Sequence, residues 1–279
     1  MKQITYALIF CLSVLALTAC GSHASADLSA APDSVAVRTV KLSDTTSFFT
    51  AAGARCEIIS DATIAVPSHF ASDSLLVLLQ GLFAEHVLAA PDSLSLDGAL
   101  RYCVGNVLYQ KDMTIDQSQE SLVDGEGEDV TLQYNTNTAV TVYYNNHSLV
   151  TFCRVDMVKK NNTVTSVTHR YYTFDLTTMT YVDLGGVIRD DAQWDVTQLL
   201  RTRLFKQNKV SNDEQLNELG YFNADNLAVS DNFYFDEHSI TWSYLPGQLA
   251  VDAIGEPQIV LSLDELKDYM SDKSVLKRL

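Results

Sequence analysis

The fold class follows from one segment, Leu149-Val150-Thr151-Phe152-Cys153-Arg154-Val155-Asp156-Met157-Val158, which is rich in residues that favour β-strands. Similar segments precede and follow it at 140–144 and 164–174. The links between them are Asn145-Asn146-His147 and Lys159-Lys160-Asn161-Asn162. Because asparagine tolerates positive φ, these links predict hairpin turns and hence an antiparallel meander.

Alternation along this middle strand predicts how the sheet is covered. One face carries Leu149, Cys153, Val155 and Met157, whereas Arg154 and Asp156 point the other way. Antiparallel sheets tolerate one solvated face. We therefore expect an α+β fold, an antiparallel sheet with helices packed mainly on the Met157 face, built as two intimately packed subdomains.

The flanking sequence predicts further elements. Strands are expected over 35–49 and 55–66, the second ending at Pro67, and a helix is expected after the capping residues Ser72 and Asp73. Further helical patterns follow Pro91-Asp92 and span 190–205. Two S-x-x-E capping boxes, Ser211 to Glu214 and Ser262 to Glu265, predict short helices, the first ended by Gly220.

The N-terminus has the pattern of a lipoprotein signal. Lys2 precedes an apolar run over 4–17, and Leu17-Thr18-Ala19-Cys20 ends it. We expect a signal peptide over 1–19, lipid on Cys20, and a lipid-anchored flexible tether over 20–36. The lipid would fix the protein in the cell envelope, at the periplasmic face of an outer membrane or at the cell surface. Cleavage by an ordinary signal peptidase is the alternative.

Charge and cysteine content limit the partners. The formal net charge of −16 over 279 residues argues against nucleic-acid binding and favours basic partners. Cys56, Cys103 and Cys153 are the thiols left to an exported domain, and three buried thiols are favoured over one disulfide with one free thiol. Their wide spacing does not fit a zinc site, and no cofactor is expected.

No catalytic pattern emerges from the sequence. There is no G-x-S-x-G segment, and Asp190-Asp191 lies at a predicted helix start, where carboxylates are favoured. The acidic stretch 124–129 lacks the spacing of a calcium loop and is expected to be a solvated loop. We therefore expect no catalytic residue and no metal site.

Aromatic residues on the predicted strands are the candidate binding residues. Seven recur there: Tyr143, Tyr144, Tyr171, Tyr172, Tyr234, Trp242 and Tyr244. They could stack on a sugar or a partner protein, and core packing is the alternative. Adjacent strand residues such as Tyr143 and Tyr144 are expected on opposite faces. Trp242, Tyr244 and Tyr234 are our candidate ligand-binding residues.

The C-terminal third shows a particular order of short segments: Phe174-Asp175-Leu176, Val182-Asp183-Leu184, Phe233-Tyr234-Phe235, Ile240 to Pro246, Gly255-Glu256-Pro257 and Leu263-Asp264-Glu265-Leu266. This order resembles the RsiV-like extracytoplasmic domain of lysozyme-sensing anti-sigma factors. The preceding region is similar in layout to the PdaC-like companion domain of a peptidoglycan deacetylase. The resemblance implies domains at 37–171 and 172–279. The family's Gly-Gly-Ala-His element is replaced by Thr165 to Tyr172.

Three functions follow as hypotheses. The first is a non-catalytic envelope lipoprotein whose ectodomain binds a protein, lysozyme-like or otherwise basic, or a peptidoglycan ligand. The second is a cell-wall glycan-modifying enzyme or an accessory subunit of one, which the deacetylase resemblance implies. The third is a structural envelope protein without a soluble ligand.

Overall fold

A computed structural model describes residues 34–49, 55–105, 131–222 and 224–279. The expected signal peptide, Cys20, the tether up to residue 33 and the acidic stretch 124–129 lie outside the described residues. Within the described part, no helix combines the length and apolar character needed to cross a bilayer.

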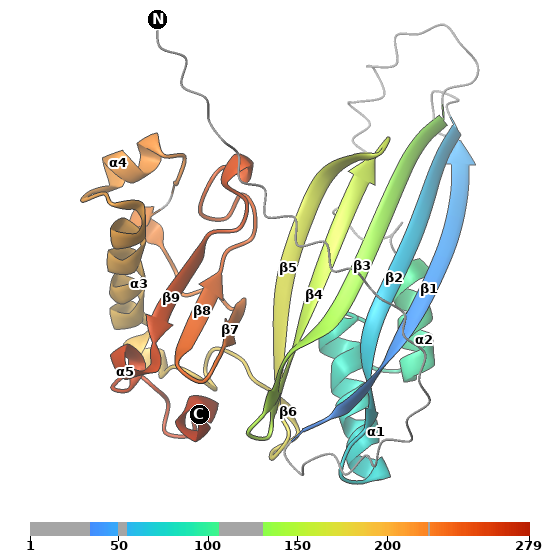
Figure 1. The fold of residues 1–279 in the computed structure, drawn as a ribbon, viewed down its shortest axis with the longest axis horizontal. Coiled ribbons are helices and arrows are strands. Elements are labelled where there is room, and N and C mark those ends of the chain that lie inside the picture. The colour runs from blue at the N-terminus through green and yellow to red at the C-terminus, as the bar shows by residue number, and fades with distance from the viewer. Residues whose placement is uncertain (1–33, 50–54, 106–130, 223) are drawn as a thin grey trace, which may run out of the picture.

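A six-stranded sheet forms the larger part of the fold (Figure 1). Its strands, in spatial and sequence order alike, are β1 (Ala36–Phe49), β2 (Arg55–His69), β3 (Thr131–Asn146), β4 (Leu149–Lys160), β5 (Thr163–Asp175) and β6 (Thr180–Tyr181). The meander β3-β4-β5 is antiparallel, as predicted. The expectation of a wholly antiparallel sheet is wrong at one place, because β2 and β3 run parallel. A parallel pair needs a long crossover, and the crossover here contains the helices.

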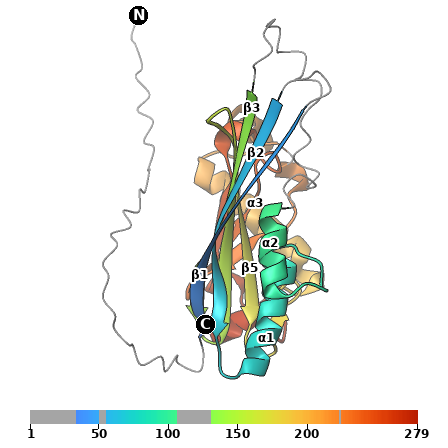
Figure 2. The same cartoon turned by 90° about the vertical axis from the view of Figure 1, so that its right-hand side faces the viewer.

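The helices α1 (Asp73–Leu82), a π-helical turn η1 (Phe83–Val87) and α2 (Leu96–Gly105) lie against one face of the sheet (Figure 2). The Ser72 hydroxyl caps α1 by accepting from the backbone N–H of Leu75, as predicted. Beneath the helices lies a buried core to which Phe83, Val150 and Phe152 belong. The α+β class with helices on one face is thus confirmed.

The face that the helices cover is the opposite of the predicted one. Val150, Phe152 and Arg154 point toward the helices, whereas the Met157 face does not. Arg154 is buried there. Its Nη1 donates to the Val87 carbonyl at 2.8 Å, and its Nε donates to Asp156 at 2.7 Å. A buried guanidinium is tolerated when its donors find such partners. The covered face was predicted wrongly because Arg154 was assumed to point into solvent.

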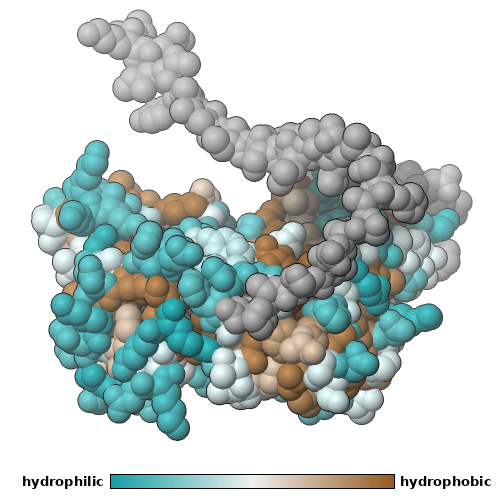
Figure 3. Space-filling model, turned by 60° about the horizontal axis from the view of Figure 1, so that its bottom comes forward, coloured by the Kyte–Doolittle hydropathy of each residue, from teal (hydrophilic) through white to brown (hydrophobic). Residues whose placement is uncertain are grey.

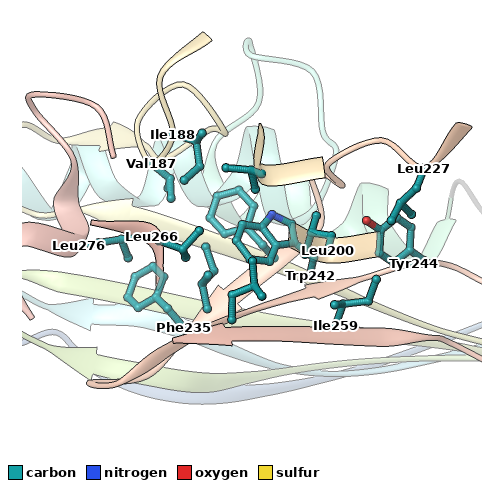
Figure 4. Packing of buried hydrophobic residues seen from close by; sticks show 14 of the residues in the cluster. Val187, Ile188, Leu200, Leu227, Phe235, Trp242, Tyr244, Ile259, Leu266 and Leu276 are labelled. Atoms are coloured by element: carbon teal, nitrogen blue, oxygen red, sulfur yellow. The ribbon is translucent and has the colours of Figure 1, made fainter. Parts of the chain in front are cut away.

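A second, smaller sheet carries the C-terminal core. It consists of β7 (Phe233–Phe235), β8 (Ser239–Ser243) and β9 (Gln258–Ser262) in antiparallel order. The flanking helices are α3 (Gln193–Asn208), α4 (Asp213–Glu218) and α5 (Leu263–Leu266), with short helical turns η5 (Asp190–Ala192), η6 (Ala224–Asn226), η7 (Asp252–Ile254) and η8 (Val275–Arg278). Trp242 lies in the core with Leu200, Phe235 and Leu266 around it (Figure 4).

Two details of these helices test the predicted caps. The capping box of Ser262 and Glu265 is present at the start of α5. The first box is displaced by one residue, because Asn212 caps α4 and the side chain of Gln215 turns back to Ser211. Gly220 follows α4 with a φ of 94°, which fits its predicted role as the end of the helix.

The two subdomains meet along β5. The expected boundary between residues 171 and 172 falls inside this strand, which continues to Asp175 and pairs with β6. The second sheet lies beside β5 through β7 (Figure 1). On the face shown in Figure 3, hydrophilic residues dominate the C-terminal side, with apolar residues between them.

Candidate functional site

Two of the three candidate binding residues are core residues. Trp242 is 0% exposed and Tyr244 is 6% exposed. The Tyr244 hydroxyl donates to the Ala228 carbonyl at 2.8 Å, while Trp242 Nε1 has no hydrogen-bond partner among the described residues. Burial raises the pKa of Tyr244. A ligand cannot reach either ring in this structure, so their assignment as binding residues is wrong and the packing interpretation holds.

Tyr234, the third candidate, lies in a tyrosine cluster at the joint between the two sheets. Its ring centroid is 4.7 Å from that of Tyr143 and 4.3 Å from that of Tyr171. The Tyr143 and Tyr171 rings meet edge to face at 5.6 Å. Tyr171 is buried, Tyr234 is half-buried and Tyr143 is 47% exposed. These three residues are called the tyrosine cluster below, and Tyr143 is the member that solvent reaches most.

A β-bulge in β3 places Tyr143 on this surface. Val142 pairs with Phe152 and Tyr144 pairs with Thr151, which leaves Tyr143 as the extra residue. Such an insertion re-aims side chains. Tyr144 then contacts Phe235 at 5.6 Å while Tyr143 contacts Tyr234, so both tyrosines reach the C-terminal subdomain. The expectation that they occupy opposite faces is wrong because it assumed regular pleating.

Polar side chains close the edge of β5 beside the cluster. The backbone N–H of His169 donates to Glu256 Oε1 at 2.7 Å, and His169 Nδ1 lies 2.9 Å from Glu256 Oε2. The Asn232 amide accepts from the N–H of Tyr171 at 3.0 Å and donates to the His169 carbonyl at 2.9 Å. These side chains replace the partner strand that an open sheet edge lacks. The joint is therefore held by backbone hydrogen bonds as well as by packing.

A further contact, between Arg278 and Asp175, fixes the same joint. Arg278 Nη1 donates to Asp175 Oδ1 at 3.0 Å, linking the last helical turn to the end of β5. Burial would raise the pKa of Asp175, but hydrogen bonds from Arg278 and from the Thr177 N–H hold it below its ordinary value. A charge therefore remains on Asp175 at neutral pH. The tyrosine cluster therefore lies at a joint whose geometry is fixed by these hydrogen bonds.

A buried thiol lies under the cluster. Cys153 on β4 is paired with Tyr171 on β5, and burial raises the pKa of its thiol to about 11. Cys56 and Cys103 are also buried free thiols, with pKa values raised by burial. Nucleophilic thiols require a lowered pKa. The three thiols therefore act as apolar core groups.

The carboxylate of Asp236 lies near enough to Tyr143 to affect its pKa. Burial of the Tyr143 hydroxyl raises its pKa to about 12, and the neighbouring Tyr234 side chain and the negative charge of Asp236 add to the increase. Asp236 accepts hydrogen bonds from the N–H groups of His238 and Ser239, which outweigh its burial and lower its pKa. Glu237 lies 4.0 Å from His147. A half-exposed ring beside a permanent negative charge suits a cationic group.

The described residues contain no group of three His, Cys, Asp or Glu side chains arranged to hold a metal ion. The expectations about cofactors and catalytic residues stay predictions. The sequence did not indicate that His169 and Glu256 contact each other at the edge of β5. Glu256 belongs to a segment that carried the family resemblance, and that was the available signal.

Residues 187–264 match the family model described as "Protein of unknown function (DUF3298)". A crystal structure of a DUF3298 family member from Bacteroides fragilis has 16% identity and a TM-score of 0.67, over 88% of this chain and 98% of that one. A DUF3298 family protein from Pseudomonas aeruginosa has 12% identity and a TM-score of 0.48, over 87% and 97%. No curated protein matches the chain. Residues 187–264 thus carry a DUF3298 match, and the fold is that of the Bacteroides fragilis DUF3298 protein.

Proposed function

We propose that this protein is a non-catalytic lipoprotein of the cell envelope whose ectodomain binds a protein or a cell-wall glycan. One observation carries the proposal: the half-exposed ring of Tyr143 is placed beside Tyr234 by a bulge, on a joint fixed by Asn232 and Glu256. Aromatic rings held in this way offer contact area at little cost in conformational entropy. The surface is therefore suited to recognition.

The charge of the molecule narrows the ligand class. A net charge of −16 attracts a basic protein at long range, and Asp236 adds a local negative charge beside Tyr143. A lysozyme-like or other basic protein meets both conditions, in keeping with the proposed RsiV-like character of the C-terminal domain. Peptidoglycan is the other ligand, because sugar rings can stack on tyrosine and because the N-terminal domain resembles the PdaC-like companion domain.

The proposed location rests on the N-terminal sequence. Acylation of Cys20 would anchor the chain to a membrane, with the periplasmic face of the outer membrane as the favoured position. The stretch from 20 to 36 would act as a tether that separates the ectodomain from the bilayer. A ligand in the envelope would then be within reach of the tyrosine cluster.

The test is a binding panel with a matched control. The chain from residue 21 onward is immobilised and offered lysozyme, other basic proteins, an acidic protein and peptidoglycan fragments. We expect saturable binding of one of them, weakened about tenfold or more by Tyr143→Ala. The control is Trp194→Ala, which removes a 71% exposed ring on α3 and leaves binding unchanged. Equal losses in both variants, or no saturable ligand, contradict the proposal.

A further inference from the structure

A hollow of about 530 Å³ opens beside α4, in the C-terminal subdomain. Its lining residues are Asp213, Asn217, Gly220, Tyr221, Phe222, Ala224, Asp225 and Val251. None of them belongs to the tyrosine cluster or to the polar contacts at β5. This volume lies within the range of small-ligand sites in proteins.

Backbone hydrogen bonds fix the shape of the hollow. The N–H of Val251 donates to the Gly220 carbonyl at 2.9 Å, and the N–H of Phe222 donates to the Leu249 carbonyl at 2.9 Å. Gly220 has a φ of 94°, and a Cβ on it would lie 3.0 Å from Val251 Cγ2 and 3.2 Å from Ile254 Cδ1. The absence of a side chain at Gly220 lets these chains pack closely. The hollow is therefore preformed.

Apolar side chains gather around it. Of the nine large hydrophobic residues that are exposed in the described part of the chain, three belong to this region: Leu219 at 50%, Val251 at 45% and Ile254 at 36%. Scattered exposed hydrophobic residues need no explanation, but a group around a hollow marks an interaction site. Tyr221 and Phe222 add half-buried aromatic surface to the lining.

The charges of the same region are mainly negative. Asp213 is paired with Arg201, yet its Oδ1 is buried and has no hydrogen-bond partner among the described residues. Asp225 lines the hollow, Glu218 is exposed at the end of α4, and Asp252 is exposed at the start of η7. These three carboxylates form no ion pair within the described residues. An apolar hollow with an acidic border complements an apolar side chain flanked by cations.

We propose that this hollow docks a segment of a partner protein that inserts one large apolar side chain and places lysine or arginine against Glu218, Asp225 and Asp252. The inference does not rest on the function proposed for the tyrosine cluster, because the two surfaces share no residue. The inserted side chain would displace water from the apolar lining, and the flanking cations would fix the register.

The test uses displayed random heptapeptides selected on the chain from residue 21 onward, with counter-selection on Val251→Lys. The matched control is Val77→Lys, which places the same charge at a 66% exposed valine on α1. We expect selected peptides to contain one large apolar residue with lysine or arginine within two positions. A synthesised peptide should bind Val251→Lys about tenfold or more weakly, bind Val77→Lys within about twofold of wild type, and weaken as salt rises from about 50 mM to about 500 mM.

Three results would overturn the proposal. The first is a selection in which no peptide prefers wild type over Val251→Lys. The second is equal binding by the Val251→Lys and Val77→Lys variants. The third is a set of selected peptides that lack basic residues and bind equally well at low and at high salt. Leu219→Lys must reproduce the loss with an unchanged circular dichroism spectrum, which separates loss of the site from loss of the fold.

Discussion

Glu256 accepts a hydrogen bond from the backbone N–H of His169 with one carboxylate oxygen, and its other oxygen lies 2.9 Å from the imidazole Nδ1 of the same residue. The two residues are 87 positions apart and belong to different subdomains. Because one carboxylate contacts both the edge of β5 and a titratable ring, the stability of the joint depends on pH.

The pH dependence has a definite sign. The hydrogen bond to Glu256 raises the pKa of His169 above 6.5, against the opposing effect of burial. The stabilisation is therefore complete below the unfolded-state pKa and is lost as pH rises through the folded-state pKa. Glu256→Gln should lower the free energy of unfolding by about 0.5–1 kcal/mol near pH 5.5, since the half-exposed ring is screened by solvent, and by much less above about pH 8.

Urea unfolding curves at several pH values measure this difference. The matched control is Glu237→Gln, because Glu237 lies 4.0 Å from His147 in an exposed pair. That control should change stability by no more than a few tenths of a kcal/mol at any pH. A loss from Glu256→Gln that stays constant from acid to alkaline pH would show that the ion pair does not contribute.

Trp242 should behave as a core residue. Trp242→Ala should destabilise the protein by about 3–5 kcal/mol, as expected for the truncation of a large buried aromatic side chain. Trp242→Phe should cost less, because Nε1 loses no hydrogen bond to a described residue. Denaturant titration measures both. If Trp242→Phe folds with wild-type stability but no longer binds a ligand that wild type binds, Trp242 has a binding role that its burial does not explain.

The three thiols should be protected in the folded protein. Cys56, Cys103 and Cys153 are buried, and burial raises the pKa of each. In the chain from residue 21 onward, a thiol reagent such as dithionitrobenzoate should react slowly in buffer and rapidly with all three in guanidinium. Fewer than three reactive thiols in the unfolded, unreduced chain would reveal a disulfide.

Lipid attachment at Cys20 has a direct test in cells. Cys20→Ser should abolish incorporation of labelled palmitate and release the ectodomain from the membrane fraction, because acyl chains would be its anchor. Cys11→Ser is the matched control, since Cys11 lies inside the expected signal peptide and should leave labelling intact. Labelling that survives Cys20→Ser would place the modification elsewhere.

Local patterns predicted the fold class well. The strand-forming composition of β4, the turn at Asn161 and Asn162 and the Ser72 and Ser262 caps depend on neighbouring residues, and each is present. The predicted alternation of buried and exposed residues in β4 is absent, because its first six residues are all buried, and the first turn is made by His147 and Ser148 instead of Asn145 and Asn146. The covered face was predicted wrongly because Arg154 is charged, and its burial depends on a carbonyl at Val87, 67 positions away. Periodicity alone does not reveal such a partner.

The candidate surface was harder to predict. The bulge at Tyr143 is a single inserted residue with no compositional mark, yet it decides which face two tyrosines occupy. Trp242 and Tyr244 were chosen for their chemistry, which serves a core as well as a surface. The contact of His169 with Glu256 joins two subdomains, and no local pattern in either segment points to the other.

The central claim is that the ectodomain binds without chemical turnover. The most direct measurement incubates the chain from residue 21 onward with insoluble peptidoglycan, with lysozyme and with both, and follows retained protein and released products together. The account predicts saturable retention of one partner, its loss in Tyr143→Ala, and unchanged peptidoglycan composition. Release or deacetylation of glycan in proportion to time and protein, lost on denaturation, would contradict it and establish an enzyme.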